Sequence, residues 1–250
     1  MSAPSTSERS TSQPNPGRTR KIKWISFLVI DAALAIALFF LFSANQQVEM
    51  QSELNDLGAT VYPEQIPLVA NFTLQDQYGG AFSVEQFSDR WSLVFFGFTN
   101  CPNICPLTMV ELGQFYRGLQ DSNPADLPMP QVVMVTVDPE RDDSEALADY
   151  VDDYHADFLG LGGDPDQIQA LAQQLYVVME NTAEREAEMM NQDTENHSQH
   201  APQGQIMSGF DHSGHISVIN PSGELHAVIR LPHRDQYLTS AYELIVDNWN

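Results

Sequence analysis

The two cysteines of the chain, Cys101 and Cys105, are its most reactive side chains, and both lie in one short segment. The segment reads Phe-Gly-Phe-Thr-Asn-Cys-Pro-Asn-Ile-Cys-Pro; it follows an apolar run and precedes a helical pattern. Two thiols at this spacing can bind a soft metal ion as thiolates or form a reversible disulfide. A disulfide here would close a very short loop and remove little chain entropy. The pattern therefore favours metal or redox chemistry over a structural crosslink.

A third ligand would complete a metal site. Soft thiolates and an imidazole match Cu(I), so two cysteines and one histidine would give a three-coordinate copper site. The seven histidines are His155, His197, His200, His212, His215, His226 and His233. His212 stands out because it lies in a small polar turn, Gly209-Phe-Asp-His-Ser213, before an expected strand at 216–220. Such a turn can bring the imidazole to the cysteines, although a lone histidine is more often a structural residue.

The elements expected around the cysteine pair are those of an α/β domain. Residues 71–84 alternate around a Gly-Gly turn and predict a hairpin, and apolar runs at 91–98 and 131–137 predict buried strands. Helices are expected at 104–119, 144–154 (with Ser144 as N-cap), 165–175 and 235–248, and further strands at 158–161, 177–180, 216–220 and 225–231. Helical crossovers give parallel pairs and the closing hairpin adds antiparallel ones, which predicts a mixed sheet. The cysteines then lie at the carboxyl edge of the sheet, where α/β folds usually hold their sites.

The remaining segments predict a membrane-anchored protein. Residues 1–23 form a polar tail expected to be disordered, 24–42 an apolar run long enough to span a bilayer, and 43–65 a polar tether. Basic residues cluster before the span and none follows until Arg90, so the positive-inside rule keeps the N-terminus in the cytoplasm. The domain at 66–250 would then be periplasmic, held at the inner membrane by one uncleaved helix. A cleaved signal peptide is the alternative.

The segment after the apolar run is strongly acidic. It contains no lysine and only six arginines against 32 Asp and Glu, which gives a formal charge of −26. A charge of this sign argues against nucleic acid as a partner. Adaptation to high salt and docking of a basic partner remain as two explanations.

Three segments resemble the signature segments of the SCO/SenC family. They are Phe96-Gly-Phe-Thr-Asn-Cys-Pro-Asn-Ile-Cys-Pro106, Val137-Asp-Pro-Glu-Arg-Asp142 and Asp211-His-Ser213, in that order. Members of this family are membrane-anchored copper proteins of cytochrome c oxidase assembly with a thioredoxin-like domain. The resemblance implies that fold here and copper ligation by Cys101, Cys105 and His212. It also implies a supporting position for Asp138 beside the site.

The resemblance further implies mainly a metallochaperone and leaves a thiol–disulfide reductase activity open. Its cargo would be Cu(I), with Cu(II) left open, and its partner would be cytochrome c oxidase subunit II. It would deliver copper to the binuclear copper site of that subunit or reduce the thiols of the site. A thioredoxin-like reductant or another copper carrier is a further expected partner. A Cys101–Cys105 disulfide would be the unloaded, regulatory state.

An insertion at 181–209 departs from the family pattern. It is too polar to build core and carries soft or borderline copper ligands, which are Met189, Met190, His197, His200 and Met207. One hypothesis is an auxiliary loop that captures copper for the main site. The other is an acidic, exposed excursion in which methionine and histidine occur by chance.

Two other classes of protein compete with the copper carrier. The first is an anchored periplasmic thiol–disulfide oxidoreductase that acts on the cysteines of a partner and needs no metal. The pair here has one more intervening residue than the usual Cys-x-x-Cys, and a reductase does not need His212. The second is a peroxiredoxin-like peroxidase, which the close spacing of the two cysteines disfavours.

Overall fold

The computed structural model describes residues 16–122, 126–181, 210–212 and 214–249, with side chains described for 32–122, 126–179 and 214–249. The chain divides into two compact units between residues 50 and 51. Of the tail predicted at 1–23, the structure describes only the residues from Pro16 onward, and these belong to a helix.

The first unit consists of most of helix α1 (Pro16–Asp56). An 18-residue window within Ala32–Asp56 of this helix has a mean hydropathy of 1.3, and by length and composition the segment could cross a membrane. Apolar side chains such as Phe39, Phe40 and Leu41 are exposed, as they would be in a span that faces lipid. The predicted span at 24–42 thus lies inside one continuous helix. In the segment expected as a tether, 43–65, α1 continues to Asp56 and a strand then begins at Ala59.

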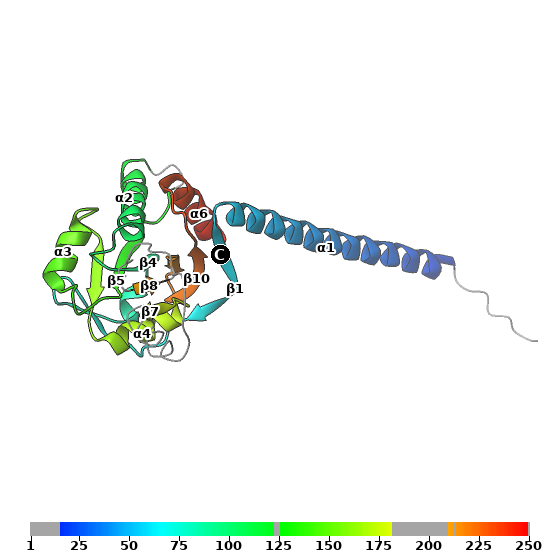
Figure 1. The fold of residues 1–250 in the computed structure, drawn as a ribbon. Helices are drawn as coiled ribbons and strands as arrows, with labels where there is room; N and C mark the ends of the chain where they lie inside the picture. Colours follow the sequence, from blue (N-terminus) through cyan, green and yellow to red (C-terminus); the bar gives the residue numbers. More distant parts are fainter. Residues whose placement is uncertain (1–15, 123–125, 182–209, 213, 250) are drawn as a thin grey trace, which may run out of the picture. The chain divides into compact units, whose positions relative to one another are not determined.

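The second unit is built on an eight-stranded sheet (Figure 1). Its strands are β1 (Ala59–Pro67), β2 (Leu74–Asp76), β3 (Ala81–Phe82), β4 (Ser92–Gly97), β5 (Gln131–Thr136), β6 (Leu159–Gly162), β9 (Ile216–Ile219) and β10 (Glu224–Ile229). They are arranged in the order β1-β10-β9-β4-β5-β6-β2-β3. Strands β7 (Met179–Asn181) and β8 (Phe210–His212) pair separately. Strand β1 pairs with β10, so the domain begins before residue 66.

The predicted mixed sheet is confirmed. Strands β4, β5 and β6 are parallel to one another, whereas β9 runs antiparallel to β4 on its other side. All six residues of β4 are buried, as expected for a central strand covered on both faces. The predicted hairpin at 71–84 corresponds to β2 and β3.

Helices α2, α3, α4 and α6 are arranged around the sheet (Figure 1). Their bounds are Ile104–Asp121, Ser144–Asp152, Pro165–Gln174 and Asp235–Asp247, and a short 3-10 helix covers Val84–Phe87. Helix α2 packs on α6 through Phe115 and Tyr242, whose ring centroids lie 5.6 Å apart. The N-cap of α3 is Asp143 rather than the predicted Ser144, because the Asp143 carboxylate accepts the Ala146 N–H at 2.9 Å.

Candidate metal centre

Cys101 and Cys105 lie beyond the carboxyl end of β4, where the chain turns into α2. The Cys101 N–H donates to the Phe98 carbonyl at 3.2 Å, and regular helix begins only at Ile104. Cys101 is therefore outside the helix, as Pro102 and Pro106 predict. Its side chain is half-buried, that of Cys105 is fully buried, and neither sulfur takes part in a disulfide.

Cys101 is the more acidic of the two thiols. A hydrogen bond from the Cys105 thiol is the largest influence, and together with backbone N–H groups it lowers the pKa of Cys101 to about 5. The N–H groups are those of Asn103, Ile104 and Cys105, at the start of α2. They have no partner inside the helix and therefore favour negative charge on the sulfur. This lowering exceeds the opposing effect of burial, so Cys101 is a thiolate at neutral pH.

Cys105 keeps its proton. Donation of its S–H to Cys101 raises the pKa of Cys105, and burial raises it further. Its sulfur lies close to the backbone of Gly97: a Cβ at that position would be 3.1 Å from Cys105 Sγ and 2.9 Å from Phe95 Cε1. The last residue of β4 is thus glycine because the Cys105 sulfur occupies the space of a side chain. A metal ion that binds both sulfurs must displace the Cys105 proton.

The loops on either side of the cysteines are held together by Asp142. This buried carboxylate accepts the Thr99 N–H at 3.0 Å, the Thr99 hydroxyl at 2.5 Å and the Thr136 hydroxyl at 2.6 Å. Because Thr99 precedes the cysteines and Thr136 ends β5, Asp142 joins the two loops that leave neighbouring parallel strands. Its charge also contributes to the raised pKa of Cys105.

Asp138, the predicted supporting residue, follows β5 at the same edge of the sheet. It is buried, and its Oδ2 lies 2.5 Å from Arg141 Nε. Burial raises the pKa of Asp138, and the nearby Arg141 opposes this effect. Its N–H donates to the Thr136 hydroxyl at 3.0 Å. In this structure its carboxylate is an ion-pair partner of its own loop, whereas Asp142 is the carboxylate that acts on the cysteines.

Sequence reasoning misses two contributors to the site, Asp142 and Tyr150. Burial raises the pKa of Tyr150, the neighbouring Tyr154 raises it further, and the two cysteine thiols add a smaller effect, which brings the phenol of α3 into the electrostatic environment of the pair. Its spacing from Leu147 and Val151 on one helix face is a signal that could have indicated a buried position. Asp142 is the last residue of a signature segment, but nothing in its type indicates what it binds.

His212 lies in strand β8 and not in a turn, which corrects the prediction for this segment. It pairs in register with Met179 of β7. Four residues later Ile216 begins β9 and pairs with Phe95, close to the carboxyl end of β4. Four residues reach at most about 14 Å, so the backbone of His212 lies within that distance of Ile216, near the edge of the sheet that carries the cysteines.

Within the described side chains, no group of three or more His, Cys, Asp and Glu is placed to hold a metal ion. The His212 side chain is not among them. The predicted auxiliary ligands Met189, Met190, His197, His200 and Met207 lie outside the described residues.

Comparisons with known proteins agree on one family. The family model SCO1/SenC matches residues 61–244. A Stutzerimonas stutzeri protein named "Putative copper-binding protein" is 31% identical over 180 residues, which cover 72% of this chain and 78% of that protein. The Homo sapiens "Protein SCO2 homolog, mitochondrial" is 39% identical over 153 residues, 61% of this chain but only 50% of that protein.

Solved structures share the fold. The Arabidopsis thaliana ScoI structure with copper bound is 21% identical, covers 73% of this chain and all of that chain, and gives a TM-score of 0.58. The apo Sco1 structure from Thermus thermophilus is 26% identical, covers 75% and 95%, and gives a TM-score of 0.55. The predicted thioredoxin-like fold is thereby confirmed.

Proposed function

Because the chain belongs to the SCO1/SenC family, we propose that it is a membrane-anchored copper metallochaperone that binds Cu(I) through Cys101, Cys105 and His212. It would deliver copper to, or prepare, the binuclear copper site of cytochrome c oxidase subunit II. The observation that carries this proposal is a pair of adjacent sulfurs, one of them held as a thiolate by a hydrogen bond from the other and by the first N–H groups of α2.

Binding of Cu(I) begins from the thiolate. Cys101 offers a charged soft ligand without first losing a proton, whereas the Cys105 thiol must release its proton to become the second ligand. Metal uptake therefore releases about one proton from the pair, and affinity falls as the pH is lowered. The name of the Stutzerimonas stutzeri relative supports copper as the cargo.

His212 supplies the third ligand in this proposal. Its support is the path of the chain from β8 into β9, which brings this segment to the edge of the sheet where β4 ends. A ligand on a separate segment lets the acceptor replace ligands one at a time, so copper can leave without a free ionic intermediate.

The proposed location is the inner membrane, with α1 as a single span, the N-terminus in the cytoplasm and the domain in the periplasm. The apolar segment Ala32–Asp56 supports an anchor, and the basic residues before it support this orientation. Anchoring beside a membrane-bound oxidase would raise the effective concentration of donor near acceptor.

A Cu(I) titration of the reduced full chain in detergent micelles tests the site. Wild type should bind one equivalent, and Cys101→Ser and His212→Ala should each weaken binding by at least about 10- to 100-fold. That is the loss typical when a residue that only hydrogen-bonds to a metal ligand is changed, and loss of a ligand itself should cost no less. His155→Ala, far along the chain from both segments, is the matched control and should bind as wild type does. Stoichiometric binding of unchanged affinity in both site variants would contradict the three-ligand site.

The insertion is tested separately. Deletion of residues 186–205, which removes four of the five auxiliary candidates, should slow copper uptake if the loop captures metal. Uptake at the wild-type rate would contradict copper capture by the insertion and leave the alternative, an exposed acidic segment in which methionine and histidine occur by chance.

The electrostatics of the cysteine pair favour one second candidate, a thiol–disulfide oxidoreductase. The Cys101 thiolate could attack a partner disulfide and release one partner thiol. Cys105 would then lose its proton and attack Cys101 Sγ, forming the Cys101–Cys105 disulfide and leaving the partner reduced. Reduction of an oxidised subunit II peptide that is unchanged in His212→Ala would favour this activity over copper transfer.

A further inference from the structure

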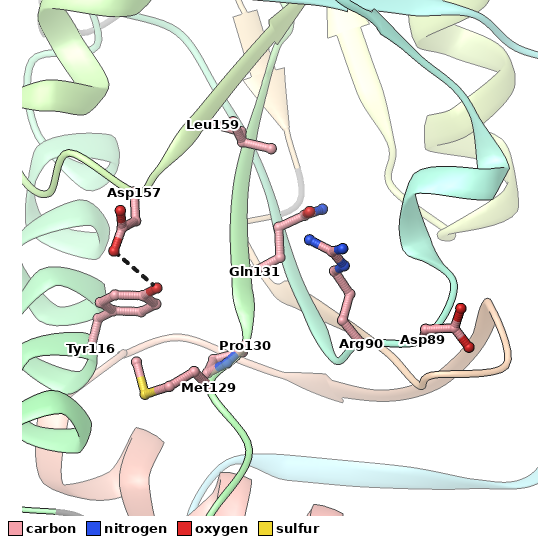
Figure 2. A pocket seen from close by; sticks show the side chains of 8 residues that line it. All are labelled: Asp89, Arg90, Tyr116, Met129, Pro130, Gln131, Asp157 and Leu159. Carbon is pink, nitrogen blue, oxygen red and sulfur yellow. Dashed lines mark hydrogen bonds between the residues drawn. The ribbon is translucent and has the colours of Figure 1, made fainter.

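A cavity of about 480 Å³ lies at the opposite edge of the sheet from the cysteines. It is formed where the chain enters β4, β5 and β6, and α2 supplies one wall. The residues that matter for its chemistry are Asp89, Arg90, Tyr116, Met129, Gln131 and Asp157 (Figure 2). Its volume is within the range of small-molecule sites in proteins. The proposed copper site does not use any of these residues.

Arg90 is a cation without a partner among the residues that the structure describes. Among the described residues of the acidic domain, each of the other four arginines has one. These are Arg117 with the Tyr154 carbonyl, Arg141 with Asp138, Arg230 with Thr60 and Arg234 with the Tyr237 ring. Arg90 forms no hydrogen bond or ion pair with any described residue, although the domain carries 32 carboxylates. Its guanidinium offers five N–H donors that point into or beside the cavity.

Gln131 adds a second unsatisfied donor. Its Nε2 is buried and has no hydrogen-bond partner among the described residues. Figure 2 shows the Arg90 and Gln131 side chains extending toward each other on one side of the cavity. Two neighbouring donors without an acceptor fit a carboxylate, whose two oxygens can receive both.

The other side of the cavity carries negative charge. Asp157 lies there, and its Oδ2 accepts a hydrogen bond from the Tyr116 hydroxyl at 3.4 Å (Figure 2). It accepts another from Gln120 Nε2 at 3.5 Å. His155 Nδ1 also lies 3.8 Å from this oxygen. These long contacts orient the carboxylate, and because its side chain is exposed it keeps capacity for a further donor. A charged amine is the group that matches this position.

We propose that this cavity binds a small zwitterion of the size of a dipeptide, with its carboxylate on Arg90 and Gln131 and its ammonium group on Asp157. The charge of the domain favours a zwitterion over a simple anion, because a net charge of −26 repels anions but not a molecule without net charge. Met129, which is partly exposed, offers apolar surface for the body of such a molecule.

Calorimetric titration of the reduced full chain in detergent micelles with alanyl-leucine tests this inference. We expect one saturable site with a Kd tighter than about 1 mM. Alanyl-leucinamide, which lacks the carboxylate, and N-acetyl-alanyl-leucine, which lacks the ammonium group, should each bind at least about 10-fold more weakly, the typical effect of losing one charge-assisted hydrogen bond.

Variants assign the charges. Arg90→Gln should weaken alanyl-leucine binding by about 10-fold or more, and Arg90→Lys should bind with an intermediate affinity because it keeps the charge but loses the planar fork. Asp157→Asn should weaken alanyl-leucine and leave N-acetyl-alanyl-leucine unchanged. Arg234→Gln, an exposed arginine outside the cavity, is the matched control and should bind as wild type does.

The inference is overturned if no saturable binding is found, if Arg90→Gln binds as wild type does, or if the N-acetylated peptide binds as tightly as the zwitterion. Far-UV circular dichroism of each variant guards against misfolding. Cu(I) uptake by Arg90→Gln should equal that of wild type, because the cavity is at the other end of β4 from the cysteines. Failure at one end therefore does not imply failure at the other.

Discussion

Strand β4 joins two regions that differ in how their polar groups are paired. Beyond its carboxyl end, Asp142 accepts three hydrogen bonds, Asp138 is paired with Arg141, and the Cys105 thiol donates to Cys101. At its amino end, the Arg90 guanidinium and Gln131 Nε2 have no partner within the described residues.

This difference in pairing suits the two ends of β4 to different ligands. At the carboxyl end, Asp142 and the Cys105 thiol have partners, although the buried Tyr150 hydroxyl has none among the described residues, and Cys101 is the one charged sulfur, so the surroundings are organised around one soft ligand. At the amino end, donors and a carboxylate are separated across a cavity, and a ligand must complete their hydrogen bonds.

His233 should make the carboxyl end sensitive to acid. It is buried between the Thr108 hydroxyl, 3.1 Å from Nδ1, and the Ile229 carbonyl, 3.2 Å from Nε2, and burial lowers its pKa to about 4. Because the unfolded value is 6.5, the unfolded chain takes up the proton first. The free energy of unfolding should therefore be highest above pH 6.5, where His233 is neutral in both states, and should fall by about 3 kcal/mol as the pH approaches 4.

Chemical denaturation of wild type and His233→Gln between pH 4 and 7 measures this contribution. The variant should lose much of the pH dependence in that window, although other buried groups will retain some. Parallel curves for the two proteins would show that His233 is not the titrating group.

Asp142→Asn should cost more stability than the same change in Asp157. Asp142 is 3% exposed and accepts three hydrogen bonds, so loss of its charge should destabilise the fold by about 2 kcal/mol. The Asp157 side chain is 59% exposed, and Asp157→Asn should change stability by less than about 0.5 kcal/mol. Urea unfolding of both variants makes the comparison, and equal losses would contradict it.

Two glycines should respond with opposite signs to alanine. Gly97→Ala places a Cβ against the Cys105 sulfur and the Phe95 ring and should destabilise by about 1–3 kcal/mol. Gly118, near the end of α2, has nothing within 4 Å of its Cβ position, so Gly118→Ala should stabilise by up to about 1 kcal/mol. Thermal unfolding distinguishes them, and a neutral Gly97→Ala would mean that the sulfur is free to move away.

Alkylation should distinguish the two thiols. Cys101 is partly exposed and has a pKa of about 5, so iodoacetamide should modify it at a rate that is nearly constant above pH 6. Cys105→Ala removes the hydrogen bond that lowers this pKa and should slow the reaction at pH 6.5 by about 10-fold. Mass spectrometry locates the adduct, and faster modification of the buried Cys105 would contradict the assignment.

Much of the framework follows from the printed order of residues. The apolar runs around Phe95 and Val133 predict β4 and β5 within about a residue, because a strand buried on both faces requires continuous apolar side chains. The start of β1 at Ala59 was not predictable, since its polar residues resemble a linker and only pairing with β10 makes them a strand. For the same reason His212 was expected in a turn and lies in β8.

The site divides in a similar way. Residue types and spacing alone indicate a cysteine pair suited to a soft metal, because sulfur chemistry depends on the atoms present. Which sulfur carries the charge depends on tertiary structure: only the start of α2 directs N–H groups at Cys101, and only close packing on Gly97 buries Cys105. The cavity at the amino end of β4 was likewise not predictable from sequence, because Arg90, Gln131 and Asp157 belong to three separate connections. Folding of the parallel strands brings those connections together, since parallel strands align their amino ends at one edge of the sheet.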